Sequence, residues 1–129
     1  MAMPDMEELA RQKGVILMKK LEIITRPDKL GALKKLLAKN EYMGMTVTPV
    51  MGCGHQKGVI KEFEGMDLDI NLLPKVHVMT VVWDEDMEGI LTEIHEVLST
   101  GNVGDGKVFI SEVLDVMRIR TGERGEKTL

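Results

Sequence analysis

The segment TGNVGDGK, residues 100–107, combines backbone freedom with a positive charge. Three of its residues are glycines that fall within six positions, and Lys107 follows them directly before an apolar, β-branched run. Because glycine costs conformational entropy, such a cluster indicates a tight turn, or a backbone that approaches another chain or a phosphate. Backbone N–H groups and a lysine ammonium suit a phosphate cradle. The segment is not a Walker A loop, because Lys107 lacks the glycine spacing and the following Ser or Thr of that motif.

Two further segments carry groups that bind anions well. The sequence RIRTG, residues 118–122, places Arg118 and Arg120 on one face of a predicted strand end, and guanidinium forks suit phosphates. The sequence CGHQKG, residues 53–58, combines glycines with a lysine and a carboxamide. Solvated surface arginines are the alternative interpretation of the first segment, so it does not identify a site by itself.

The sequence offers no catalytic set to accompany these segments. The histidines at positions 55, 77 and 95 are far apart in the chain and lack the spacing of metal ligands. Cys53 and His55 share a predicted strand face, but two ligands are too few for a zinc site. The acidic run at residues 84–86 is better explained as the start of a helix than as paired catalytic carboxylates. Anion-friendly segments without a nucleophile and base favour a nucleotide sensor over a nucleotide hydrolase.

The periodicity of the sequence predicts the elements that position these segments. Apolar residues alternate, or recur at helical spacing, in six stretches. They predict strands at residues 19–25, 45–52, 75–83 and 107–119, and helices at residues 28–40 and 84–99. The order βαββαβ is that of a ferredoxin-like α+β fold, in which two helices cover one face of a four-stranded antiparallel sheet.

A loop from Gly54 to Leu73 separates the second and third predicted strands. It contains three glycines and many charges but no clean apolar period. Loops of about 20 residues inside a compact domain are uncommon and are usually functional. We therefore expect this loop to take part in the function of the protein.

The sheet face that points away from the helices needs a partner. The third predicted strand contains the run VHVMTVVW, which is apolar at both of its alternating sets of positions. An exposed apolar face of that size is usually covered by another subunit, so we expect an oligomer.

Composition and charge limit the remaining classes. The 129 residues suffice for one domain, which we expect at residues 18–129 after an extension at residues 1–17. A net charge of −4 without a basic run argues against nucleic-acid binding, and the longest apolar run is too short to span a bilayer. A single cysteine excludes an internal disulfide and suits a reducing cytosol, so we expect a cytoplasmic protein.

Several motifs of the chain occur together in one known family. They are TGNVGDGKVFISEV at 100–113, KKLEIITRPDKL at 19–30, GMTVT at 44–48, GHQKG at 54–58, LPKV at 73–76 and RIRTGE at 118–123. Their identity, order and spacing resemble those of the PII nitrogen-regulatory signal-transduction proteins, over residues 18 to about 127. The first motif is the most specific, because it resembles the whole C-terminal signature of that family.

The resemblance implies a non-catalytic homotrimer that senses metabolites. Members of the family bind ATP or ADP in three clefts between subunits, and 2-oxoglutarate beside Mg-ATP at the base of a long T-loop, here residues 54–73. They regulate nitrogen metabolism by docking this loop on a target protein such as an ammonium channel, glutamine synthetase or nitrogenase. Neither nucleic-acid binding nor membrane insertion is expected.

The resemblance also implies the residues of the site. Residues 101–107 would hold the phosphates, and Arg118 and Arg120 would reach in from the neighbouring subunit. The implied nucleotide-binding residues are Thr46, Gly54, His55, Gln56, Lys75, Gly104, Asp105, Gly106, Lys107, Arg118 and Arg120. Gln56 would ligate Mg²⁺, Lys75 would pair with a carboxylate of 2-oxoglutarate, and the implied residues for that ligand are Gln56, Lys57, Gly58 and Lys75.

The chain departs from the family pattern in and beside the T-loop. His55 stands where the family commonly has an arginine, so a permanent charge becomes a titratable one. Leu68 stands at the position of the tyrosine that is uridylylated in many relatives, and Met66 at that of a serine that is phosphorylated in some. These changes point to a divergent branch, such as the regulators of nitrogenase or partners of ammonium channels.

A protein of another class stays open at this stage. Divalent-cation-tolerance proteins share the trimeric ferredoxin-like architecture and bind metal, and a small anion is a further possible ligand of such a trimer. The only sequence feature that favours this alternative is the run Cys53-Gly54-His55.

Overall fold

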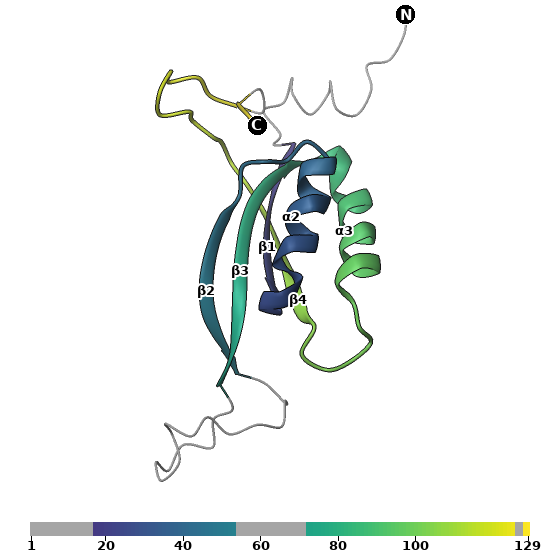
Figure 1. Ribbon diagram of the computed structural model, residues 1–129. Coiled ribbons are helices and arrows are strands. Elements are labelled where there is room, and N and C mark those ends of the chain that lie inside the picture. Colours follow the sequence, from purple (N-terminus) through teal and green to yellow (C-terminus); the bar gives the residue numbers. More distant parts are fainter. Residues whose placement is uncertain (1–16, 54–71, 126–127) are drawn as a thin grey trace, which may run out of the picture.

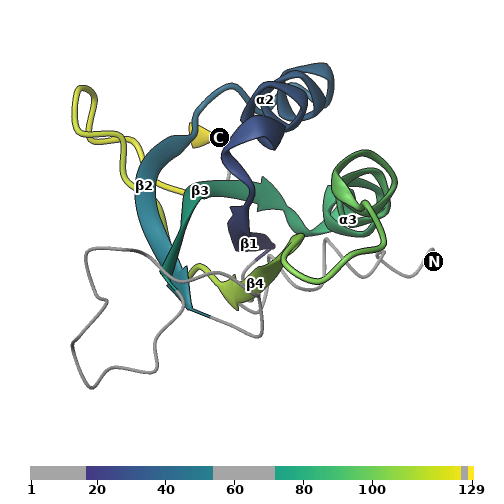
Figure 2. The ribbon, with the colours of Figure 1, turned by 60° about the horizontal axis from the view of Figure 1, so that its bottom comes forward.

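The computed structural model describes residues 17–53, 72–125 and 128–129 (Figure 1). In chain order the elements are β1 (Met18–Thr25), the 3-10 turn η1 (Pro27–Lys29), α2 (Leu30–Lys39), β2 (Thr46–Cys53), β3 (Leu72–Trp83), α3 (Asp84–Leu98) and β4 (Gly106–Glu112). The strands pair antiparallel in the order β2-β3-β1-β4. Both helices lie on the same side of the sheet (Figures 1 and 2). The predicted ferredoxin-like α+β fold is therefore confirmed.

The core lies between the helices and the central strands. Successive side chains of a strand point to opposite faces of a sheet, so alternate residues of β1 and β3 face the helices. The helices present apolar residues at three- and four-residue spacing toward the same space. The buried apolar cluster comprises Leu21, Ile23, Val76, Val78 and Val82 from the strands, and Leu33, Leu36, Leu37, Ile90, Ile94 and Leu98 from the helices. This packing fixes the ends of the strands, from which the functional loops emerge.

Tyr42 ties the connection between α2 and β2 to the start of α3. The side chain is buried, and its hydroxyl donates to Asp86 Oδ2 at 2.5 Å and accepts from the backbone N–H of Trp83 at 2.9 Å. Burial and the hydrogen bond to Asp86 raise the pKa of this phenol above its usual value. The only tyrosine of the chain is thus part of the scaffold.

The open face of the sheet is mixed rather than uniformly apolar. Met79 and Val81 of β3 lie on it and are half-buried, as the alternation of the third predicted strand suggested. Glu22 of β1 lies on the same face, and its carboxylate is 3.2 Å from Nε2 of His77. Phe109 of β4 pairs with Glu22 there and is 52% exposed. The expected apolar surface is present but includes charged groups, and the trimer stays a prediction.

The fourth strand is shorter than predicted. The expectation of a strand over residues 107–119 is wrong at its C-terminal end, because β4 stops at Glu112. Glu112 pairs with Lys19, one residue after the start of β1, so the neighbouring strand offers almost no further partner. Beyond it the chain forms a turn that is closed by a bridge between Met117 and Arg124.

The third strand begins earlier than predicted. Leu72 and Leu73 belong to β3, where they pair with Cys53 and Gly52, and so fall outside the T-loop that was predicted at residues 54–73. Pro74 is tolerated because β1 reaches only as far as Val76, so one side of β3 has no neighbouring strand at this point. Most of the predicted T-loop, residues 54–71, lies outside the described residues, as do residues 1–16.

The helices begin and end close to their predicted boundaries. Pro27 opens the 3-10 turn that leads into α2, and the side-chain amide of Asn40 donates to the Leu36 carbonyl at 2.9 Å where that helix ends. The second predicted helix ends at Leu98, one residue early. Neither helix of the described residues is long and apolar enough to cross a membrane.

Candidate functional site

The glycine loop, residues 99–105, connects α3 to β4 at the end of the sheet where β1 stops (Figure 1). Gly101, Gly104 and Gly106 all have positive φ values, of 80°, 98° and 110°. Side chains rarely adopt such backbone conformations, so the glycine cluster is required by the shape of the chain here. Gly106 is also required by space, because an added Cβ would lie 1.8 Å from the carbonyl oxygen of Ile24.

The carboxylate of Asp105 shapes the glycine loop from within. It accepts hydrogen bonds from the backbone N–H and the hydroxyl of Thr100, at 2.7 and 2.5 Å, and from the N–H of Gly101 at 3.1 Å. These bonds from Thr100 hold the pKa of the carboxyl at about 2. Asp105 therefore organises the loop and has little remaining capacity to contact a ligand through its side chain.

Two residues at the end of β1 hold the glycine loop from outside. The Thr25 hydroxyl donates to the Asp105 carbonyl at 3.0 Å, and the guanidinium of Arg26 donates to the Val103 carbonyl at 2.9 Å. Arg26 Nε also lies 3.5 Å from the Asp105 carboxylate. Neither residue was predicted from the sequence to contact this loop. The only signal was an arginine between a strand and a proline, which does not reveal the loop that it faces.

Lys75 connects β3 to the glycine loop. Its side chain passes over Gly52, where an added Cβ would lie 3.0 Å from Lys75 Cγ, and its ammonium donates to the Gly104 carbonyl at 2.6 Å. The side chain is buried, and this burial, with the nearby charge of Arg26, lowers the pKa of the ammonium. The structure thus brings Lys75 together with the loop, although 29 residues separate it from Gly104 in the sequence.

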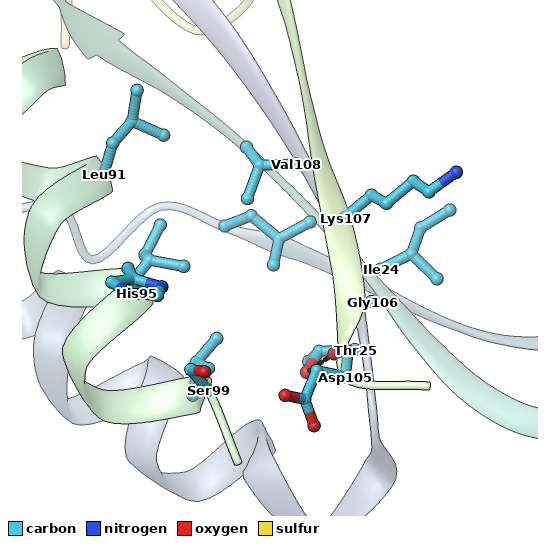
Figure 3. A pocket seen from close by; sticks show the side chains of 12 residues that line it. Ile24, Thr25, Leu91, His95, Ser99, Asp105, Gly106, Lys107 and Val108 are labelled. Atoms are coloured by element: carbon cyan, nitrogen blue, oxygen red, sulfur yellow. Dashed lines mark hydrogen bonds between the residues drawn. The ribbon is translucent and has the colours of Figure 1, made fainter. Parts of the chain in front are cut away.

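Lys107 lies on the open face of the sheet beside the loop. It pairs with Ile24 in the register of β1 and β4, and Figure 3 shows its side chain pointing away from α3. Thr46 is on the open face as well, because it pairs with Met79 of β3. Met79 is four positions along β3 from Lys75, which at the rise of a strand is about 13 Å. Thr46 is therefore on the expected face but at a distance from the loop.

Arg118 and Arg120 lie at the opposite end of the molecule from the glycine loop. Glu112, where β4 ends, is six positions along the strand from Gly106, which corresponds to about 20 Å. The C-terminal segment continues away from there, as the yellow trace in Figure 1 shows. Arg118 is 3.8 Å from the Glu123 carboxylate and is not on a strand end as predicted. One chain therefore does not bring these arginines to the loop.

The other predicted site residues lie outside the described part of the chain. They are Gly54, His55, Gln56, Lys57 and Gly58, so Lys75 is the only described residue of the predicted 2-oxoglutarate site. Within the described ranges, no group of three or more His, Cys, Asp or Glu side chains gathers as metal ligands would.

A pocket of about 320 Å³ lies on the helix side of the sheet, between α3, β1 and β4 (Figure 3). Leu91, Ile94 and Val108 give it apolar walls, and His95 lies at its edge. It borders the glycine loop at Asp105, and Lys107 also lines it, although the Lys107 side chain points away from α3. No local sequence pattern indicates this pocket, because its apolar walls are residues that the sequence pattern assigns to the core.

The fold and the loop define a ferredoxin-like domain whose glycine loop presents backbone and cationic groups at one end of an open sheet. Residues 18–123 match the family model described as P-II, the nitrogen regulatory protein. The chain belongs to this family of nitrogen regulatory signal-transduction proteins, as the motifs of the sequence indicated.

Individual relatives support this assignment over most of the chain. The chain is 45% identical to nitrogen regulatory protein P-II 2 of Methanothermobacter thermautotrophicus over 115 residues, which cover 89% of this chain and 100% of the relative. It is 44% identical to the P-II protein of Rhizobium meliloti over 108 residues, 84% of this chain and 96% of the relative.

Solved structures of related proteins have the same fold. The GlnK–ATP complex of B. subtilis matches with a TM-score of 0.71 and 34% identity, over 87% of this chain and 97% of that one. Arabidopsis thaliana PII bound to citrate matches with a TM-score of 0.69 and 34% identity, over 88% of this chain and 92% of that one.

Proposed function

We propose that this protein is a cytoplasmic, non-catalytic sensor of ATP or ADP and of 2-oxoglutarate. It would report these ligands by docking its T-loop on a target protein of nitrogen metabolism. The observation that carries the proposal is the glycine loop with Lys75 bound to the Gly104 carbonyl and Lys107 beside it. The related B. subtilis GlnK was solved as a complex with ATP, which supports nucleotide as the ligand of such a loop.

The described residues fit the phosphates of a nucleotide. Two glycines of the loop and Gly106, the first residue of β4, have positive φ values, which lets the N–H groups here turn toward an anion as side-chain-bearing residues rarely allow. Lys107 on the open face and the buried Lys75 supply positive charge at the same end of the sheet. A bound triphosphate would bring Mg²⁺, which Gln56 would help to ligate and which would link the nucleotide to a second anion.

The remaining cationic groups of this site would come from a neighbouring subunit. Arg118 and Arg120 are too far from the glycine loop of their own chain, so a second copy must supply them. The same C-terminal segment exposes large apolar side chains, and Ile119 alone is 92% exposed. An exposed apolar arm of this kind is stabilised when another subunit covers it, which supports the homotrimer.

2-Oxoglutarate would bind at the junction of the T-loop and β3. Lys75 lies three residues after the start of β3 and carries a buried ammonium, which suits a carboxylate. Gln56, Lys57 and Gly58 would complete this site from the other side of the T-loop. The carboxylate would replace the Gly104 carbonyl as the partner of Lys75, so ligand binding would alter the contact between β3 and the glycine loop.

The target would be an ammonium channel, glutamine synthetase or nitrogenase, and uridylylation would not control the docking. Leu68 has no hydroxyl at the usual position of the modified tyrosine. The only tyrosine, Tyr42, is buried with its hydroxyl bound to Asp86. The alternative function in metal binding gains no support from the described residues, where Cys53 is exposed and no ligand cluster gathers.

Isothermal titration calorimetry of the full chain tests the proposal. We expect Mg-ATP and Mg-ADP to bind, and 2-oxoglutarate to give heat only when Mg-ATP is present, because Mg²⁺ prefers to exchange its waters for ligands in a site that is already formed. The coupling must be reciprocal, so 2-oxoglutarate should tighten ATP by the same factor. Lys107→Ala should weaken nucleotide binding, whereas Lys39→Ala, in an ion pair with Glu93 on the helix side, is the matched control. Equal heats of 2-oxoglutarate with and without nucleotide would contradict the proposed sensor.

A further inference from the structure

The backbone conformation of Arg26 places its side chain at the end of β1. It is extended, with φ −66° and ψ 143°, and it precedes Pro27, whose ring disfavours the helical alternative for the residue before it. The side chain is 32% exposed and has its guanidinium against the glycine loop. Arg26 is thus fixed by local chain geometry as well as by its contacts.

The hydrogen bond from Arg26 sets the orientation of one peptide group. Arg26 Nη2 donates to the Val103 carbonyl at 2.9 Å, and the described chain contains no cis peptide bonds. In a trans peptide the carbonyl and the following N–H point in opposite directions. The N–H of Gly104 therefore points away from the guanidinium, and no hydrogen bond within the described ranges uses it.

Lys75 holds the next peptide group in the same manner. Its ammonium binds the Gly104 carbonyl at 2.6 Å, so two cations hold consecutive carbonyls of the loop. Arg26 also places its Nε 3.5 Å from Asp105, whose carboxylate gathers the N–H groups of Thr100 and Gly101. A planar guanidinium can reach a carbonyl and a carboxylate at once, which an ammonium cannot do in the same geometry.

We propose that Arg26 is a positioning residue of the anion site. It orients the Val103–Gly104 peptide so that the N–H of Gly104, which has no acceptor among the described residues, is presented to a phosphate group, and it does so without contacting the ligand. This inference rests on the proposed function, because it assumes that the loop binds the phosphates of a nucleotide. It adds a residue that acts from behind the loop to those that face the ligand.

Calorimetry with Mg-ATP on the full-length protein tests this role through two substitutions. Arg26→Ala should weaken Mg-ATP on the order of tenfold, the equivalent of one charge-assisted hydrogen bond. Arg26→Lys keeps the charge but not the fork, so its affinity should stay closer to that of Arg26→Ala than to the wild type. Lys39→Ala, which removes an exposed cation of α2 that pairs with Glu93, should leave the affinity unchanged.

The outcomes separate this inference from the proposed function. If Arg26→Lys binds as tightly as the wild type while Arg26→Ala is weak, the charge of Arg26 matters and its positioning role is wrong. If the wild type binds Mg-ATP and Arg26→Ala binds equally well, the inference alone fails. A wild type that binds no nucleotide overturns the proposed function and this inference together.

A second measurement shows whether the peptide itself responds. In ¹H–¹⁵N spectra without ligand, Arg26→Ala and Arg26→Lys should both shift the Gly104 amide signal, while signals of the buried core, such as Ile90, stay in place. Unmoved Gly104 signals in both variants would contradict the orienting role. Displaced core signals would show that the substitutions disturb the fold, and would contradict a role confined to the loop.

Discussion

Gly106→Ala is the substitution for which the structure gives the clearest consequence. The residue begins β4, directly opposite Thr25 of β1, and has a φ of 110°. A Cβ at this position would lie 1.8 Å from the carbonyl oxygen of Ile24, 2.8 Å from the carbonyl carbon of Ile24 and 3.0 Å from Thr25 Cα. All three atoms are backbone, so no side chain can rotate away, and β4 must separate from β1 where the glycine loop ends.

Backbone strain and weakened hydrogen bonds together set the expected loss of stability. A side chain in so sparsely populated a backbone conformation costs about 1–3 kcal/mol. Moving the strand from 1.8 Å to ordinary contact weakens roughly two hydrogen bonds at the end of the ladder, at about 0.5–1.5 kcal/mol each. Gly106→Ala should therefore lower the free energy of unfolding by about 2–6 kcal/mol.

Gly101→Ala is the matched control. Gly101 lies in the same loop with a φ of 80°, but an added Cβ meets no atom within 4 Å. It should show only the backbone strain, about 1–2 kcal/mol. Urea unfolding followed by circular dichroism, at one protein concentration for all variants, measures both. Equal free energies for the two variants would refute the argument that the approach of β1 requires a glycine at position 106.

Two further substitutions test the scaffold and the loop. Tyr42→Phe removes the hydroxyl that bonds Asp86 and the N–H of Trp83, and should cost about 1–3 kcal/mol in urea unfolding; an unchanged midpoint would contradict this structural role. Asp105→Asn should destabilise the protein at neutral pH but not in acid. The pKa of this carboxyl is lowered from 3.8 to about 2 in the folded protein, so the charged carboxylate stabilises the fold at pH values above 3.8. This stabilisation is lost as the pH falls from 3.8 toward 2. Unfolding curves of both proteins from pH 6 to pH 2 should converge; a constant difference would show that the charge of Asp105 is not what matters.

The sequence predicted helices and strands well where the residues of one segment are enough to define its periodicity. The apolar run at residues 75–83 predicted a strand with two apolar faces, and in β3 one of the two sets, with Val76, Val78 and Val82, is buried against the helices. The glycines of the loop were also informative, because a positive φ is a local requirement that the sequence must satisfy at that position.

The predictions failed where a segment distant in the sequence determines the end of a strand or the contacts of a side chain. The end of β4 depends on where β1 begins, and Glu112 is paired with Lys19 only because of the register between the two strands. The role of Arg26 depends on the same register, which brings it to Asp105 across 79 residues of sequence. No local sequence pattern indicates this contact between Arg26 and Asp105. An arginine before a proline was therefore no reason to place Arg26 at the glycine loop.

The location of Lys75 supports the proposed response of two separate loops to one ligand. β3 begins at Leu72, directly after residues 54–71 of the predicted T-loop, and Lys75 is the fourth residue of this strand. The Lys75 side chain passes over Gly52 of β2. Its ammonium ends on the Gly104 carbonyl, so the root of the T-loop and the glycine loop share a direct hydrogen bond. A buried ammonium cannot be left without a partner at low cost, so a ligand that takes the place of Gly104 must itself offer an oxygen acceptor. The proposed exchange of a carbonyl for a carboxylate meets that requirement, and it frees the Gly104 peptide at the moment when Lys75 binds the ligand.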